Sequence, residues 1–106
     1  MPTIAPVPSA DAITEKFAFL TKKWKAERGP HSSISRLAMH PAYQQIIGMG
    51  SVAVPLILRE LESNADHWFW ALNAITGADP VPESGRGVMR EMVKAWLDWG
   101  IEHGYR

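Results

Sequence analysis

The sequence predicts an all-α protein, a compact bundle of about five helices in a single domain. Apolar side chains recur at every third or fourth position in several segments, as they do along the buried face of a helix. No run of residues shows the apolar and polar alternation between turn residues that is typical of a half-buried strand. Glycines and prolines fall mostly between the periodic segments, where they start or end helices. The length of 106 residues is near the commonest size of one domain.

The N-terminal segment, residues 1–9, holds three of the eight prolines. Proline lacks the backbone N–H that a helix or sheet needs, so we expect a flexible, extended arm here. The single helical domain is then expected to cover residues 10–106. Its first helix should open at Ser9 or Asp11, because either side chain can accept a hydrogen bond from the first helical turn.

The first helix is expected from about Ala12 to Arg28, and Gly29-Pro30 should end it. Four of its apolar side chains share one face: Ile13, Phe17, Leu20 and Trp24. Its lysines lie mostly off this face, and such a run of charges is usually a solvated surface. A patch that binds phosphate or acidic groups is the alternative.

Residues 31–50 predict two short helical pieces, although the segment could equally be a recognition loop. The first piece should end at His40, because the residue before a proline is pushed out of the helical region. The second piece is expected to begin at Pro41, since proline suits the first position of a helix, and to end at Gly48.

Residues 48–77 form the clearest pattern and predict two helices that fold back and bury one face against each other. Ser51 is expected to cap the first helix, with Pro55 in its first turn, where a missing N–H costs little. Apolar side chains then follow at helical spacing: Val54, Ile57, Leu58 and Leu61. A polar turn follows, in which Asp66 is the expected cap of the second helix. Gly77 should end that helix with a left-handed backbone.

A polar loop at residues 78–87 is expected to lead into a last helix from about Val88 to His103, closed by Gly104. Loops of this kind are the usual place for specificity. Two adjoining apolar lines run along the last helix: Met89, Met92, Val93, Trp96, Trp99 and Gly100.

The composition excludes several kinds of site. The chain has no cysteine, so disulfides, thiol catalysis and thiolate metal sites are ruled out. No stretch approaches the roughly 20 apolar residues that span a bilayer, and the N-terminus lacks a secretory signal, so we expect a cytoplasmic protein without a membrane partner. Six basic and three acidic residues lie in positions 1–53, against five basic and eight acidic residues in positions 54–106. This mild asymmetry is far from the strongly basic surface of a typical nucleic-acid-binding protein.

No catalytic, metal-binding or cofactor motif is apparent. None of the four histidines has another three or four residues away, so no helix presents two of them to a metal: His31, His40, His67 and His103. Paired carboxylates for proton transfer are missing locally. The glycine-rich pieces at 48–50 and 85–87 lack the strand-to-helix setting of a phosphate-binding loop. We therefore expect no cofactor, no metal and no enzymatic activity, although residues far apart in the sequence can still assemble a site.

Five tryptophans are an unusual number for so short a chain. Most of them are expected to fill a thin helical core, because large aromatic side chains bury much area. One or two could instead lie on a contact surface, since tryptophan is enriched among binding hot spots. Trp70 is the first choice for an exposed position, because on a helix it lies opposite the line of Trp68, Leu72 and Ile75.

Residues 48–77 carry a further pattern: Gly48 and Gly50, then Val52-Ala53-Val54-Pro55-Leu56-Ile57, Leu61, Ala71-Leu72 and Ile75-Thr76-Gly77. This order resembles one HEAT-like repeat of the phycobilisome-lyase type, from which Trp68-Phe69-Trp70 departs. The whole chain is also similar to a group of short bacterial proteins with HPAYQ.IIGMG, WFWAL.AITG..PVP and AW..WG...GY in this order. The resemblance implies a bundle built around one HEAT-like αα-hairpin.

Two functions follow from these observations. The first is a non-enzymatic helical protein–protein interaction module, such as a small adaptor, inhibitor or antitoxin-like partner, which would bind another protein through Trp70, Trp68, Asn73 and Arg59. The alternative is a nucleic-acid-binding regulator with a helix-turn-helix-like hairpin, whose contacts would come from Lys22, Lys23, Lys25 and Arg28. Zero net charge weakens the alternative, because little affinity would come from counterion release.

Overall fold

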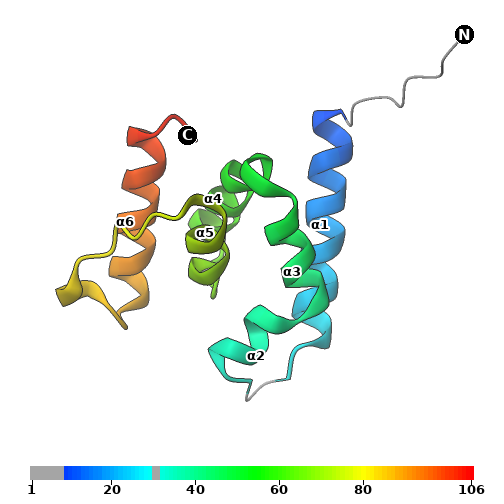
Figure 1. The fold of residues 1–106 in the computed structure, drawn as a ribbon, viewed down its shortest axis with the longest axis horizontal. Helices are drawn as coiled ribbons and strands as arrows, with labels where there is room; N and C mark the ends of the chain where they lie inside the picture. Colours follow the sequence, from blue (N-terminus) through cyan, green and yellow to red (C-terminus); the bar gives the residue numbers. More distant parts are fainter. Residues whose placement is uncertain (1–8, 30–31) are drawn as a thin grey trace, which may run out of the picture.

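The computed structural model describes residues 9–29 and 32–106, and this part of the chain is all-α (Figure 1). Its six α-helices are α1 (Ala10–Glu27), α2 (Ile34–Met39), α3 (Pro41–Gly48), α4 (Val54–Ser63), α5 (Phe69–Thr76) and α6 (Met89–Glu102). Two short 3-10 helices, η1 (Gly50–Ala53) and η2 (Glu83–Gly85), precede α4 and α6. No strand occurs in the described ranges, and the predicted all-α bundle is confirmed.

The first helix begins two residues before its predicted start. Ser9 is its cap, since the Ser9 hydroxyl accepts a hydrogen bond from the Ala12 N–H at 3.1 Å. The predicted apolar face is confirmed: Phe17, Leu20 and Trp24 are buried, and Ile13 is half-buried. Of the predicted arm at residues 1–9, only Ser9 lies among the described residues.

Both short helices of the 31–50 segment form as predicted. Pro41 is the first residue of α3, which ends at Gly48. His40 caps α3, because its Nδ1 accepts a hydrogen bond from the Ala42 N–H at 3.0 Å. Trp24 ties α2 to α1 by donating from its indole Nε1 to the Leu37 carbonyl at 2.9 Å. The loop alternative for this segment is therefore wrong for its described part, residues 32–50, while His31 lies outside the described residues.

The two helices of the predicted hairpin pack mainly against other helices. Among the α-helices, the chief neighbour of α5 is α3 and that of α4 is α6, whereas α4 and α5 contact each other much less. Figure 1 shows α1 and α6 at opposite ends, with α4 and α5 between them. The expected contact between α4 and α5 is therefore present but minor, because aromatic side chains of α1 and α3 hold the start of α5.

The predicted cap at Ser51 is also wrong. Ser51 lies inside η1, where its carbonyl accepts a hydrogen bond from the Val54 N–H. The following α4 has no side-chain cap, although Pro55 does lie in its first turn as predicted. The 3-10 turn continues directly into α4, so the serine side chain has no free helix end to cap.

Four aromatic residues, which we call the aromatic cluster, form the centre of the core: Phe17, Trp24, Tyr43 and Trp68. The ring centroid of Trp24 lies 4.8 Å from that of Trp68 and 5.0 Å from that of Tyr43. Tyr43 and Trp68 are stacked, with an angle of 12° between their planes. Because such rings bury much area, this cluster joins α1, α3 and the start of α5 into one unit.

A glycine allows α4 and α6 to approach each other closely. A Cβ atom at Gly100 would lie 2.5 Å from Cδ1 of Leu58, whose side chain is fully buried on α4. Further along, Gly104 closes α6 as predicted, with a φ of +78°. The close approach of α4 and α6 at Gly100 places Trp96 of α6 in the core.

No single helix in the described part of the chain is long and apolar enough to cross a membrane. One pair of helices, Pro41–Gly48 with Gly50–Ser63, passes that test together by length and composition, with a bend of 110° between its members.

Candidate functional site

Two tryptophans separated by one residue have opposite environments. Trp68 immediately precedes α5 and is fully buried in the aromatic cluster, whereas Trp70 is the second residue of α5 and is 42% exposed. Positions two apart on a helix point in nearly opposite directions, which explains the contrast. The predicted exposure of Trp70 is confirmed. Trp68 was predicted to contact a partner, and this is wrong, because its side chain has no accessible surface.

Trp70 lines a hollow of about 380 Å³, which we call the Trp70 hollow. Its walls come from α2, α5, α6 and the segments before them: Ile34, His67, Phe69, Trp70, Gly87, Met89 and Met92. Ile34 is 55% exposed, so the hollow presents accessible apolar side chains from α2 as well as α5. Methionine side chains adapt to the shape of what they contact. Two exposed apolar side chains beside one hollow make it a candidate interaction site.

Tyr43 holds the end of α5 that carries Trp70. Its hydroxyl donates to the His67 carbonyl at 3.0 Å and accepts from the Ala71 N–H at 2.9 Å. Burial raises the pKa of Tyr43 well above its ordinary value, so the hydroxyl keeps its proton. It can therefore donate one hydrogen bond and accept the other. The residue at the cap position of α5, Trp68, provides no side-chain cap. Tyr43 therefore satisfies a first-turn N–H that a capping side chain would otherwise satisfy.

Asp66 does not cap α5, contrary to the prediction. Its carboxylate accepts two hydrogen bonds from the Arg28 guanidinium, at 2.9 Å and 2.8 Å, and one from the His67 N–H at 2.8 Å. Lys25 lies 4.0 Å from the same carboxylate and also pairs with Glu60 at 2.8 Å. Two hydrogen bonds from one arginine bind the Asp66 carboxylate more strongly than a single helix N–H would. The turn that contains Asp66 is therefore oriented toward α1.

The pKa of Asp66 is lower than its ordinary value. Burial by itself raises this pKa, but the hydrogen bonds from Arg28 and His67 and the charges of Arg28 and Lys25 outweigh it. Asp66 therefore remains ionised at neutral pH and ties the segment before α5 to the end of α1.

We expect Asp66→Asn to lower the free energy of unfolding at pH 7 by about 2 kcal/mol, because Arg28 loses a half-buried carboxylate partner. A carboxylate whose pKa is lower in the folded state stabilises the protein above its unfolded pKa, and this stabilisation is lost as the pH falls through the folded pKa. The difference between wild type and variant should thus shrink below about pH 4.

Urea unfolding curves at neutral and strongly acidic pH measure both parts of this prediction. Asp98→Asn is the control, because it removes the exposed pair with Lys94 and should change stability little. An Asp66→Asn difference that is equally large at both pH values would contradict the assignment.

The structure brings only one other predicted contact residue close to Trp70. Asn73 is exposed on α5, and its side chain donates to the Ala78 carbonyl at 2.9 Å, holding the start of the 78–87 loop. It lines a smaller hollow of about 300 Å³ that shares Phe69, Gly87 and Met92 with the Trp70 hollow. Arg59 instead lines a groove between α1 and α4 and takes no part in the Trp70 hollow.

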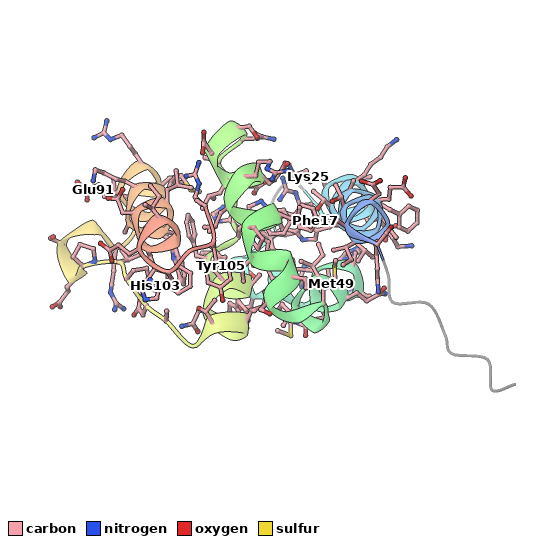
Figure 2. All side chains as sticks on the ribbon, turned by 90° about the horizontal axis from the view of Figure 1, so that it is seen from above. Phe17, Lys25, Met49, Glu91, His103 and Tyr105 are labelled. Carbon is pink, nitrogen blue, oxygen red and sulfur yellow. The ribbon has the colours of Figure 1, made fainter. Side chains whose placement is uncertain are left out.

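Three of the four cations predicted for nucleic-acid binding form ion pairs within the chain. Lys25 and Arg28 pair with Glu60 and Asp66, and Lys23 pairs with Glu27 at 3.4 Å. Figure 2 shows Lys25 and Phe17 on the side of α1 that faces α4. Lys22 is exposed at the edge of the groove between α1 and α4. Nucleic acid would have to displace acidic side chains of the protein from most of this set.

Sequence reasoning missed several residues of the site. Ile34, Met89 and Met92 belong to helices that the sequence predicted, but no spacing in the sequence indicates that they meet beside Trp70. The role of Tyr43 as a cap from another helix was equally invisible, because the two residues it bonds lie 24 and 28 positions away.

No protein-family model, curated protein sequence or solved structure matches this chain. The resemblance of residues 48–77 to a HEAT-like repeat therefore stays a prediction. Among the residues that the structure describes, no three histidine, aspartate or glutamate side chains converge as they would around a metal ion.

Proposed function

We propose that this protein is a helical interaction module without enzymatic activity, which binds a segment of another protein in the Trp70 hollow. The observation that carries the proposal is the exposure of Trp70 and Ile34 around one apolar depression. Burying apolar surface contributes about 25 cal/mol per Å², so an apolar side chain of the partner would gain most by entering here. His67 supplies a polar group at the edge for a hydrogen bond.

Rigid walls support this proposal. Trp70 stands on a helix end that is held by Tyr43 and Asp66, and both of these residues are anchored to other helices. A pre-organised surface loses little conformational entropy on binding, which favours affinity. Met89 and Met92 provide the adaptable part of the same surface. The nucleic-acid alternative has weaker support, because most of its cations are already paired.

The test is affinity capture from a lysate of the source organism, with the bound proteins identified by mass spectrometry. Trp70→Ala should weaken the captured complex by about 2 kcal/mol, or roughly 30-fold in affinity, because a central tryptophan is removed. Ile34→Ala, on a different helix of the same hollow, should weaken it as well. Ile101→Ala is the matched control, since Ile101 is 62% exposed on α6 and takes no part in the Trp70 hollow.

The proposal fails if the wild-type protein captures no protein that depends on Trp70. It also fails if Trp70→Ala and Ile101→Ala weaken the complex equally, because the contact would then lie outside the hollow. Circular dichroism of each variant confirms that a lost partner does not reflect a lost fold.

A further inference from the structure

The outer face of α1 combines an exposed aromatic ring with lysines. Phe19 is 66% exposed, the largest value among the large apolar side chains in the described part of the chain. Four exposed charged residues lie within one helical turn of Phe19: Glu15, Lys16, Lys22 and Lys23. Together with Phe19 they form a surface that we call the Phe19 face. Lys16 and Lys22 form no ion pair with any described residue, so their charges are available to a partner.

A groove of about 450 Å³ runs along α6 beside the loop that precedes η2, and we call it the α6 groove. Its apolar lining comes from Pro80, Pro82, Ala95 and Trp99. Its acidic lining is formed by Glu91, Asp98 and Glu102, against the single cation Lys94. Lys94 pairs with Asp98 at 2.7 Å, while Glu91 and Glu102 have no basic partner among the described residues.

The ring of Trp99 is fixed in this groove by other aromatic side chains. It lies 5.3 Å from the Trp96 ring and stacks with the rings of His103 at 4.5 Å and Tyr105 at 5.4 Å. A flat, immobilised ring next to proline side chains is a suitable contact for another aromatic side chain. The α6 groove therefore offers an apolar floor and two free carboxylates.

The Phe19 face and the α6 groove are complementary in charge, because the face carries two lysines and the groove two carboxylates that are unpaired within the described part of the chain. We propose that the Phe19 face of one copy of this protein docks in the α6 groove of a second copy, so that the chains associate head to tail. Phe19 would contact Trp99 and the two prolines, while Lys16 and Lys22 would approach Glu91 and Glu102. Along α6 these two carboxylates are about 16 Å apart at 1.5 Å per residue, a span that long lysine side chains on either side of Phe19 can reach.

A contact between these two surfaces requires two copies of the protein, because within one chain they lie too far apart. Figure 1 shows α1 and α6 at opposite ends of the bundle, with α4 and α5 between them. Figure 2, seen from above, shows Glu91 at the opposite end from Phe17 and Lys25 of α1. A contact between two different surfaces leaves one of each free on every pair, so it extends into rings or open chains.

The association should be weak and sensitive to salt. One helix face covers less than the about 800 Å² per partner that a stable interface buries. Charged contacts at the edge of such an interface are screened as ionic strength rises. The Trp70 hollow is a different surface, so this inference does not depend on the proposed function.

The experiment is sedimentation velocity of the full chain over a range of protein concentrations. At low salt the weight-average sedimentation coefficient should rise with protein concentration. At high salt it should fall back to the value of the monomer. Phe19→Asp, which removes the anchor, and the double variant E91K/E102K, which reverses the charge of the groove, should each weaken association at least tenfold. Trp70→Ala should associate like the wild type.

A mixture of the two blocked variants gives the decisive result. Each variant alone should be monomeric, but the intact Phe19 face of E91K/E102K should bind the intact groove of Phe19→Asp, so that the mixture stops at one-to-one dimers. Isotope labelling of one component at a time should place the NMR shift changes on α1 of E91K/E102K and on α6 of Phe19→Asp.

Three outcomes would overturn the inference. A wild-type protein that stays monomeric at low salt and high concentration excludes the contact. Association of E91K/E102K by itself would show that like surfaces meet, and loss of association in Trp70→Ala would move the contact to the Trp70 hollow. Because the substituted residues are exposed, circular dichroism should show all variants folded.

Discussion

Trp68→Ala should lower the free energy of unfolding by about 4 kcal/mol, a large part of the total stability of a domain of this size. The Trp68 side chain is fully buried, and its ring lies 4.8 Å from that of Trp24 and 5.7 Å from that of Phe17. Its removal leaves a cavity where α1, α3 and α5 meet. Urea unfolding followed by circular dichroism measures the change.

Trp68→Phe separates packing from hydrogen bonding at this position. The indole Nε1 of Trp68 is buried without a hydrogen-bond partner among the described residues, so losing it costs no bond. We therefore expect Trp68→Phe to be clearly less destabilising than Trp68→Ala. If the two substitutions lowered the free energy of unfolding equally, the aromatic ring would not be the stabilising group.

Trp70→Ala is the matched comparison, because it is the same substitution two residues away. Trp70 is exposed, so its loss should change the free energy of unfolding by less than about 1 kcal/mol. A Trp70→Ala variant as unstable as Trp68→Ala would show that Trp70 belongs to the core. The Trp70 hollow would then be no binding surface.

The second large effect is expected for Tyr43→Phe, which should lower the free energy of unfolding by about 2–3 kcal/mol. The substitution keeps the ring of a fully buried residue and removes only its hydroxyl. The His67 carbonyl and the Ala71 N–H then lose their partner in a site with little access for water. Leaving a buried polar group without a partner destabilises a protein by more than one typical hydrogen bond stabilises it. This difference explains the size of the effect.

Amide hydrogen exchange gives a local readout of the same substitution. The Ala71 amide should exchange faster in Tyr43→Phe, because it lies in the first turn of α5 and has no other acceptor there. Tyr105→Phe is the control, since the Tyr105 hydroxyl makes no hydrogen bond with any described residue and its loss should change stability little. Unchanged Ala71 exchange in Tyr43→Phe would show that the hydroxyl does not cap α5.

The two predictions connect the core to the proposed binding surface. Trp68 and Tyr43 together determine where α5 begins, and Trp70 is carried by that first turn. A variant such as Tyr43→Phe should therefore weaken partner binding through a less ordered α5, whereas Trp70→Ala weakens it by removing the contact itself.

Local patterns in the sequence were sufficient to predict the helices and most of their ends. The boundaries of α3 at Pro41 and Gly48 and the left-handed end of α5 at Gly77 were predicted correctly, and Ser9 was one of the two predicted caps of α1. Each depends on the backbone geometry and hydrogen bonds of a few consecutive residues, so neighbouring residues are sufficient to indicate it.

Which helices meet and which side chains remain exposed depends on contacts between distant parts of the chain. Asp66 looked like a local cap, but Arg28, distant in the sequence, offers two hydrogen bonds and draws it away from α5. In the same way Ile34 and Trp70 reach one hollow from separate helices. Periodicity specifies the buried face of a helix but not the partner that covers it, because the partner depends on the shapes and charges of residues far away in the chain.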